Sequence, residues 1–326
     1  MKSAWLLMGS ASLVSAGLYL SAQMGSAGSL VLALLAPLPL FLVGLSMGAR
    51  AVSISGAAAA LIVIFVTGGL GAVMYIFTHA APAFLIAWKA GLSRPVSDSS
   101  GATTHLWYPP GLLIVWLAAP PIAMLVLAFG YGTATGDGFK ELVAIHMEPV
   151  LQVIRSAPSE TIPGLADKPS TEQMAAIEDL VVRLIPVTIA LVGMFTSLAN
   201  GLLAQNLLVR FGRNVRPSPR MSEIVLPLWL IGAMAGCLLV HFLVGGDLGF
   251  LAATVAGILA FPVFMSGLGV AHALAERTKS PFAILFMTYA MLMIAGYVMM
   301  IVMTAVGLID HFAGLKARIR AGSNQT

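Results

Sequence analysis

Long apolar runs without charge are the feature that most limits the folds open to this chain. Of its 326 residues, 59% are hydrophobic and only 9% are charged, whereas a soluble domain carries about 25% charged residues. Runs of about 20 apolar residues cross a bilayer as helices, because backbone polar groups in lipid must be paired internally. The runs are continuous rather than alternating, which disfavours a β-barrel. The sequence therefore predicts an all-α, polytopic transmembrane helical bundle.

We expect about eight or nine spans in this bundle. They lie at residues 4–22, 28–47, 51–68, 71–88, 110–130, 182–208, 224–244, 248–272 and 282–307. The chain then divides into 1–130 with about five spans, an external loop at 131–181, 182–307 with about four spans, and a polar, basic tail at 308–326. Residues 4–22 also resemble a signal peptide, but their positive end is weak and apolar sequence continues through Leu20, so we expect an uncleaved span.

Lysine and arginine in the short loops predict the orientation of the spans. Cytoplasmic loops carry an excess of these residues, and by parity the basic loops fall on one side, with Lys89, Arg94, Arg210, Arg213, Arg216, Arg220, Arg277 and Lys279. The acidic loop 131–181 then lies outside. Nine spans place the C-terminus outside as well, although the tail contains the basic sequence "LKARIR". Either the charge rule fails there or one segment is re-entrant.

The external loop contains two helical patterns. "GFKELVAIHMEPVLQVIR" spaces its apolar residues as one face of a helix, which Pro149 should kink or divide. Ser170 and Gln173 form a capping-box pattern before a second amphipathic helix that runs into the sixth span. We interpret both as helices at the outer membrane interface. The alternative is a lid over an external cavity.

A short phrase, P-x-F-x-x-G-L, occurs twice in the spans. Pro39 and Gly44 in the first copy correspond to Pro262 and Gly267 in the second. Proline bends a helix and glycine lets a neighbouring helix approach closely, so these residues are predicted to serve packing. Two kinked helices in matching places are also typical of parallel transporter repeats, although chance explains so short a match equally simply.

Three residues at the predicted cytoplasmic ends of the spans are predicted to anchor these ends at the membrane surface. Arg50 follows the first copy of the phrase, and His272 and Arg277 follow the second. Basic side chains there lie among lipid headgroups and hold the helix end in place.

Polar residues inside the spans are few, and they are the candidates for ligand binding. His79 and His241 lie in the predicted outer halves of their spans, and Asn200 and Gln205 lie in the sixth span. Polar groups in a membrane are costly and often functional. The alternative is structural, since such groups also hydrogen-bond between helices or cap helix ends. Asp247, in the turn "GGDLG", is predicted to cap.

Several classes of function are disfavoured by missing motifs. The sequence has no G-x-x-x-x-G-K-[ST], no H-E-x-x-H and no Cys/His cluster, and Cys237 is its single cysteine. We therefore expect no metal, no cofactor and no enzymatic activity. The formal net charge of +4 reflects loop lysines and arginines, and no basic patch interleaved with aromatic residues suggests a nucleic-acid partner.

The C-terminal third resembles the YybS-like family of uncharacterised bacterial membrane proteins. The resemblance rests on "FPVFMSGLGVAHALAERTKSP" and "GLIDHFAGLKARIR", with support from "PLPLFLVGLSMGARAV" and "PAFLIAWKAGLSR". It implies a distant similarity to the S components of energy-coupling-factor transporters, compact six-helix proteins that bind a small solute and work with a separate ATPase module. This chain has more predicted spans and a large external loop.

We expect a multi-pass protein of the bacterial inner membrane, in contact with the lipid bilayer. Two hypotheses for its function follow. The first is a small-solute-binding or transport subunit that relies on a separate energising partner, such as an ATPase module. The alternative is a non-transporting membrane scaffold or assembly factor, which would use the same prolines and glycines for packing.

Overall fold

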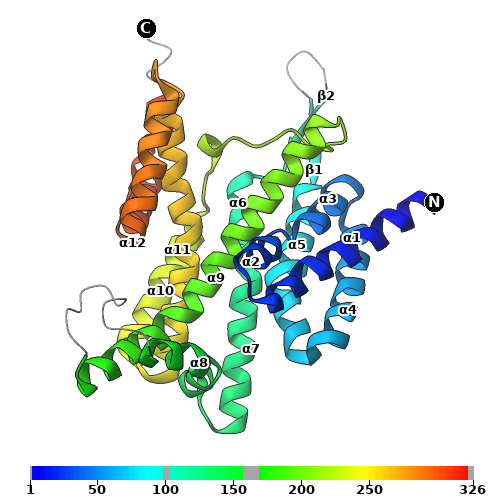
Figure 1. Ribbon diagram of the computed structural model, residues 1–326. Coiled ribbons are helices and arrows are strands. Elements are labelled where there is room, and N and C mark those ends of the chain that lie inside the picture. Colours follow the sequence, from blue (N-terminus) through cyan, green and yellow to red (C-terminus); the bar gives the residue numbers. More distant parts are fainter. Residues whose placement is uncertain (1, 98–102, 157–168, 322–326) are drawn as a thin grey trace. The chain divides into compact units, whose positions relative to one another are not determined.

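A computed structural model describes residues 2–97, 103–156 and 169–321 (Figure 1). Its described residues are almost entirely helical, apart from one short β-hairpin, so the all-α prediction is confirmed. The chain forms two compact units. Unit 1 comprises Met1–Pro121, Gly193–Leu230 and Leu259–Thr326, and unit 2 comprises Ile122–Val192 and Ile231–Ile258.

Seven helical stretches among the described residues are long and apolar enough to cross a membrane. They are Ser3–Met24, Ala27–Met47, Ala49–Ala90, Pro110–Thr135, Thr171–Arg210, Gly246–Ala275 and Pro281–Ala313. The runs predicted at 51–68 and 71–88 lie within one of these stretches, and the run at 224–244 forms a shorter helix. Large apolar side chains such as Phe65 and Met293 are exposed on the protein surface, as lipid-facing residues are in a membrane protein.

The N-terminal part of unit 1 is a group of short packed helices. Its elements are α1 (Lys2–Ser21), η1 (Ala22–Met24), α2 (Ala27–Leu34), α3 (Leu38–Met47), α4 (Ala49–Tyr75), a π-helical turn η2 (Ile76–Ala80) and α5 (Ala81–Ala90). Pro37 and Pro39 separate α2 from α3, because proline fits the start of a helix but not its interior. Gly68 has φ 78° inside α4, which breaks this helix and turns the chain.

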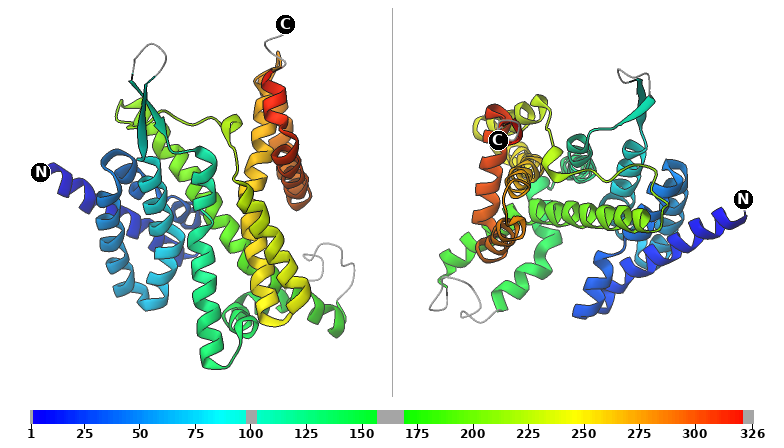
Figure 2. Two further views of the ribbon diagram at one scale, coloured as in Figure 1. Left: turned by 180° about the vertical axis from the view of Figure 1, so that it is seen from behind. Right: turned by 90° about the horizontal axis from the view of Figure 1, so that it is seen from above.

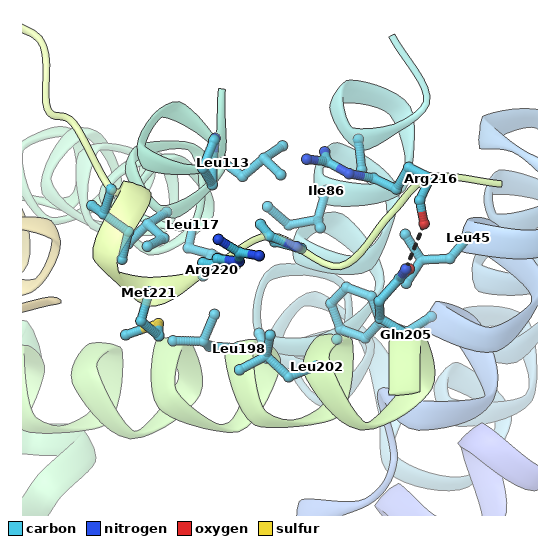
Figure 3. A pocket seen from close by; sticks show the side chains of 18 residues that line it. Leu45, Ile86, Leu113, Leu117, Leu198, Leu202, Gln205, Arg216, Arg220 and Met221 are labelled. Carbon is cyan, nitrogen blue, oxygen red and sulfur yellow. Dashed lines mark hydrogen bonds between the residues drawn. The ribbon is translucent and has the colours of Figure 1, made fainter. Parts of the chain in front are cut away.

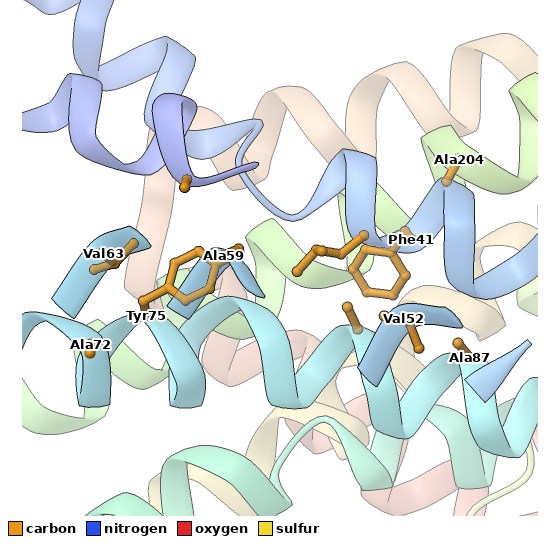
Figure 4. Packing of buried hydrophobic residues seen from close by; sticks show 11 residues of the cluster. Phe41, Val52, Ala59, Val63, Ala72, Tyr75, Ala87 and Ala204 are labelled. Atoms are coloured by element: carbon orange, nitrogen blue, oxygen red, sulfur yellow. The ribbon is translucent and has the colours of Figure 1, made fainter. Parts of the chain in front are cut away.

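Buried residues of these helices form one hydrophobic core (Figure 4). Phe41 and Leu40 of α3 pack with Val52, Val63 and Tyr75 of α4, and all five are almost fully buried. The Tyr75 hydroxyl lies 2.7 Å from Ser15 Oγ of α1, which satisfies its polar tip inside the core. This core fixes the positions of α3 and α5, which supply one side of the cavity described below.

A β-hairpin and a short helix follow α5. Strands β1 (Ser93–Ser97) and β2 (Thr103–Trp107) pair antiparallel, with Ser93 opposite Trp107. Helix α6 (Pro110–Trp116) then begins with a proline in its first turn, and α7 (Ala119–Thr135) continues the chain into unit 2. The hairpin was not predicted, since "SRPVS" and "TTHLW" are too short and polar to stand out beside the apolar runs.

The C-terminal part of unit 1 is held by a close crossing of two helices. Helix α11 (Gly246–Ala275) meets α12 (Pro281–Ala313) at Gly267 and Gly307. A Cβ atom on Gly267 would overlap the Met303 carbonyl oxygen, and one on Gly307 would overlap the Val263 carbonyl oxygen. The two backbones therefore touch, as glycine permits in membrane helices.

Helix α12 begins and ends on the same side of unit 1. Gly296 has φ 41° and ψ −113°, which breaks the helix near its middle. After it, helix α13 (Leu315–Ala321) returns to the end of α11, where Arg277 Nη2 donates to the Arg320 carbonyl oxygen at 3.2 Å. Figure 2 shows the C-terminal helices beside α11 from two further sides. Both ends of α12 thus lie near the end of α11, as the re-entrant alternative for this segment expects. The side of the membrane on which the C-terminus lies stays a prediction.

Unit 2 contains the two helices predicted in the long loop. Helix α8 (Phe139–Ser156) continues through Pro149 without a break, and α9 (Thr171–Arg210) is a single 40-residue helix. The capping box is present, because Gln173 N donates to Ser170 Oγ at 3.2 Å and Ser170 N donates to Gln173 Oε1 at 2.9 Å. Residues 157–168, between the two helices, lie outside the described residues.

Ion pairs and one distant cap hold unit 2 together. Lys140 Nζ lies 2.5 Å from Asp179 Oδ1, and Arg155 Nε lies 2.7 Å from Glu178 Oε1, so α8 pairs with the start of α9. Asp247, at the start of α11, accepts hydrogen bonds from the backbone N–H groups of Phe139 and Lys140. It caps α8, as the sequence predicts for this residue. The remaining helix, α10 (Leu228–Val244), lies mostly in this unit.

Candidate functional site

A cavity of about 120 Å³ lies within unit 1, between α9 and the loop that follows it (Figure 3). One face of α9 forms its floor, with Ser197, Gly201 and Gln205 in one row and Leu198 and Leu202 in the next. These spacings of four residues place the side chains on the same side of a helix. The other lining residues are Phe41, Leu45, Ile86, Ala90, Pro110, Leu113, Ile114, Leu117, Arg216, Pro219, Arg220, Met221 and Ile224.

Most of the cavity wall is apolar, and its size suits a small occupant. Leucines 45, 113, 117, 198 and 202 face it together with Phe41 and Ile86. A dry cavity of about 150 Å³ in another protein holds benzene. A cavity of about 120 Å³ therefore suits a group about as large as one ring or a short alkyl chain.

Arg216 is the unusual member of the lining. It is only 7% exposed, and its Nη2 donates to the Tyr108 carbonyl oxygen at 3.4 Å. Its Nε and Nη1 atoms are buried and have no hydrogen-bond partner among the described residues. Burial lowers the pKa of this guanidinium, but arginine keeps its proton in proteins. A buried cation with free N–H donors is costly unless an acceptor reaches it.

The backbone of Arg216 is fixed by amide side chains, which hold the loop against α9. Gln205 Nε2 donates to the Arg216 carbonyl oxygen at 2.8 Å, and Asn214 Nδ2 donates to the same oxygen at 3.1 Å. Figure 3 shows Arg216 and Arg220 on the loop side of the cavity and Leu198 and Leu202 on the α9 side. The α9 side of the cavity is therefore mostly apolar, and the loop side carries two arginines.

Ser197 supplies a second free polar group. It is 1% exposed and lines the cavity, and its Oγ has no hydrogen-bond partner among the described residues. Buried hydroxyls are normally paired. Two unpaired polar groups in the lining of one cavity mark a place where a bound molecule would complete the hydrogen bonding.

The four residues predicted as ligand candidates lie in different surroundings. Gln205 lines the cavity. Asn200 donates from Nδ2 to the Leu34 carbonyl oxygen at 2.8 Å and so ties α9 to α2. His79 lies in the π-helical turn, stacked on Tyr75 with ring centroids 5.5 Å apart. His241 Nδ1 lies 2.9 Å from the Gly249 carbonyl oxygen in unit 2. Of the four, the structure brings Gln205 alone to the cavity.

The two copies of the repeated phrase have different local structures. Pro39 lies in the first turn of α3, whereas Pro262 lies inside the continuous helix α11. Each glycine lies at a close contact between two helices. A Cβ on Gly44 would lie 2.7 Å from Ala87 Cβ, and Gly267 touches α12. The difference at the prolines favours a chance match over a structural repeat.

The predicted edge residues are spread over unit 1. Arg50 is exposed at the start of α4. His272 Nε2 lies 3.0 Å from the Tyr289 hydroxyl oxygen, and Arg277 contacts Arg320. These positions are compatible with anchoring, which stays a prediction for them.

A second buried cation, Lys316, was not predicted as a site residue. Its Nζ lies 3.0 Å from Asp310 Oδ2 and donates to Ser266 Oγ at 2.8 Å and to the Ile224 carbonyl oxygen. Asp310 Oδ1 accepts from the backbone N–H of Lys316 at 2.8 Å. Every polar atom of this pair has a partner, so the pair joins α12, α13 and α11 as a structural unit.

Sequence reasoning missed Arg216 for an identifiable reason. It is one of four arginines between the sixth and seventh predicted spans, and the charge rule assigns all four to a solvated loop. The two prolines that follow it, Pro217 and Pro219 in "RNVRPSPR", are the available signal, because they stiffen the loop. That signal does not show which arginine turns inward.

Comparison with known proteins gives one family. The family described as "Predicted membrane protein (DUF2232)" matches residues 14–311. No curated protein and no solved structure matches the chain. The match agrees with a membrane protein that contacts lipid, and the family description names no substrate and no partner. The resemblance to the YybS-like family and to S components stays a prediction.

Proposed function

Because the chain belongs to the DUF2232 family of predicted membrane proteins, we propose that it is a small-solute-binding subunit. In this proposal it lies in the bacterial inner membrane, carries out no reaction of its own and relies on a separate energising partner. The sequence supports the need for a partner, because it contains no nucleotide-binding motif.

One observation carries this proposal: the cavity on α9 combines an apolar wall with buried, unpaired polar groups at Arg216 and Ser197. Ligand sites are typically apolar hollows with a few well-placed polar groups. A scaffold protein has no need to leave such groups unpaired, because close packing between helices would satisfy them or replace them with apolar residues.

Native mass spectrometry of the protein purified gently from its own host tests the proposal. We expect a reproducible small-molecule adduct on the wild-type chain and its loss in Ser197→Leu, which fills the cavity. Ser53→Leu is the matched control, since Ser53 is exposed on α4 and does not line the cavity.

An ATPase module that copurifies with the adduct would support the transport form of the proposal. A chain without any adduct, purified with stoichiometric proteins of other kinds, would overturn the proposal in favour of a scaffold.

A further inference from the structure

We infer that the cavity takes an organic anion, with a single carboxylate or phosphate group held by Arg216 and an apolar body about the size of one ring or a short alkyl chain. This inference rests on the proposed function and adds the chemical class of the ligand. The shared chemistry has two sources, which are a free organic acid and an anionic lipid, of which only the phosphate and an adjoining part about as large as one ring would lie in the cavity.

The charge of the occupant follows from Arg216. None of the ion pairs among the described residues includes this arginine. Glu223, the acidic residue nearest to it along the loop, is exposed and forms no ion pair either. A buried guanidinium without a carboxylate is incomplete, and the free Nε and Nη1 atoms are donors that suit anionic oxygens.

The surroundings of Arg216 favour an anion over a neutral or cationic solute. Arg220 also lines the cavity. A cluster of like charges raises the local concentration of oppositely charged solutes. A cation would meet repulsion from both lining arginines.

The apolar body follows from the rest of the wall. Apart from Arg216, Arg220, Gln205 and Ser197, every lining residue is apolar. Sugars and nucleosides carry many hydroxyl or amide groups, which would lose hydrogen bonds to water here without replacement. A hydrocarbon ring or chain is desolvated favourably on the same surface.

Equilibrium binding of radiolabelled hexanoate and benzoate to the purified chain tests this inference, with hexanamide and benzamide as uncharged probes of the same shape. We expect the acids to bind about tenfold or more tightly than the amides, because hydrogen bonds to charged groups are the stronger ones. This comparison uses the wild-type chain and does not depend on how any variant folds.

Variants then assign the effect to Arg216. Arg216→Gln should lower acid binding about tenfold or more and leave amide binding nearly unchanged. Arg213→Gln, which removes the same charge from an exposed position in the loop, should change neither. Ser197→Leu should weaken both acids and amides, because it fills the space that they share.

A separate experiment tests whether the bound anion is a lipid. The protein is transferred into vesicles of phosphatidylcholine, with or without phosphatidylglycerol, and examined by native mass spectrometry. Phosphatidylglycerol retained by the wild type and lost in Arg216→Gln identifies a lipid as the anion, whereas acid binding without lipid retention identifies a free acid.

The two proposals fail in different ways. If acids and amides bind equally and Arg216→Gln changes nothing, or if neither acid nor phosphatidylglycerol binds, the anion inference is overturned. The proposed function fails separately, when the adduct from the host is absent from the wild-type chain.

Discussion

Two buried cations in unit 1 show how the same kind of residue serves different purposes. Lys316 reaches a carboxylate, a hydroxyl and a carbonyl oxygen. Arg216 reaches one carbonyl oxygen and the Trp107 ring, and its Nε and Nη1 have no hydrogen-bond partner among the described residues. A buried charge whose hydrogen bonds are complete fixes a fold. A buried charge that is incomplete is available to a ligand.

Removing Lys316 should destabilise the protein strongly. Lys316→Met leaves Asp310 as a buried carboxylate without its cation, and breaking a buried pair costs about 3–5 kcal/mol. Chemical unfolding in detergent measures the loss. Arg318→Met is the control, because Arg318 is exposed on the same helix, and we expect it to change stability by less than about 0.5 kcal/mol. Equal stability of the two variants would contradict the structural role of the pair.

At the residue scale, the sequence predicts which side chains are polar but not which of them turn inward. Gln205 was predicted as a candidate and does line the cavity. Arg216 was assigned with its neighbours to a solvated loop, because charge counting treats all loop arginines alike. Burial of a single side chain depends on contacts between distant segments, here the loop that contains Arg216 with Tyr108.

At the element scale, local signals predicted helix starts well. The capping box at Ser170 agrees with the sequence, because it depends on residues within one turn. The span predicted at 28–47 instead divides into α2 and α3 at Pro37 and Pro39. The break at Gly68 lies at the boundary predicted between the spans 51–68 and 71–88, whereas the break at Gly296 was missed inside the span 282–307. The sequence does not distinguish a glycine that continues a helix from a glycine at which the chain turns, because both lie in apolar runs.

The α11–α12 crossing predicts that Gly267→Ala disrupts the C-terminal helices. The new methyl group would overlap the Met303 carbonyl oxygen, and overpacking of this kind costs about 1–3 kcal/mol or more. Gly236→Ala is the matched control on α10, where a Cβ meets nothing within 4 Å, and it should be neutral or slightly stabilising. Thermal unfolding in detergent compares them. A Gly267→Ala protein as stable as the control would contradict the close crossing.

The cap on α8 predicts a local effect of Asp247→Ala. The change removes the acceptor of the Phe139 and Lys140 backbone N–H groups, and loss of such a cap costs about 1 kcal/mol. Hydrogen exchange at the first turn of α8 should accelerate by about fivefold. Asp137→Ala, at an exposed neighbouring position, should leave this exchange unchanged. The capping role is wrong if both variants exchange alike.

At the scale of the whole molecule, the sequence predicts the membrane class better than the number of spans. The composition averages over many residues, so the prediction of a membrane protein does not depend on any single position. The number of spans depends on single glycines such as Gly296, where α12 breaks and turns back toward the end of α11. A re-entrant α12 would place the basic tail on the side that the charge rule predicts for it.

This topology predicts which engineered cysteines react together. In a Cys237→Ser background, Ala321→Cys and Arg213→Cys should react with a membrane-impermeant maleimide from the same side of vesicles. The contact of Arg320 with the Ser222 carbonyl oxygen places the tail near that loop. Asp137→Cys, in the loop predicted to be external, should react from the opposite side. Labelling of Ala321→Cys together with Asp137→Cys would contradict a re-entrant α12.

The central claim is that Arg216 lies buried in an apolar cavity as the partner of a bound anion. An experimental density map of the wild-type protein, purified gently from its own host, tests this claim most directly. We predict density in the cavity that contacts Arg216 Nε or Nη1 and extends along Leu198 and Leu202. An empty cavity, with Arg216 turned to solvent or paired with a carboxylate of the chain, would contradict the account.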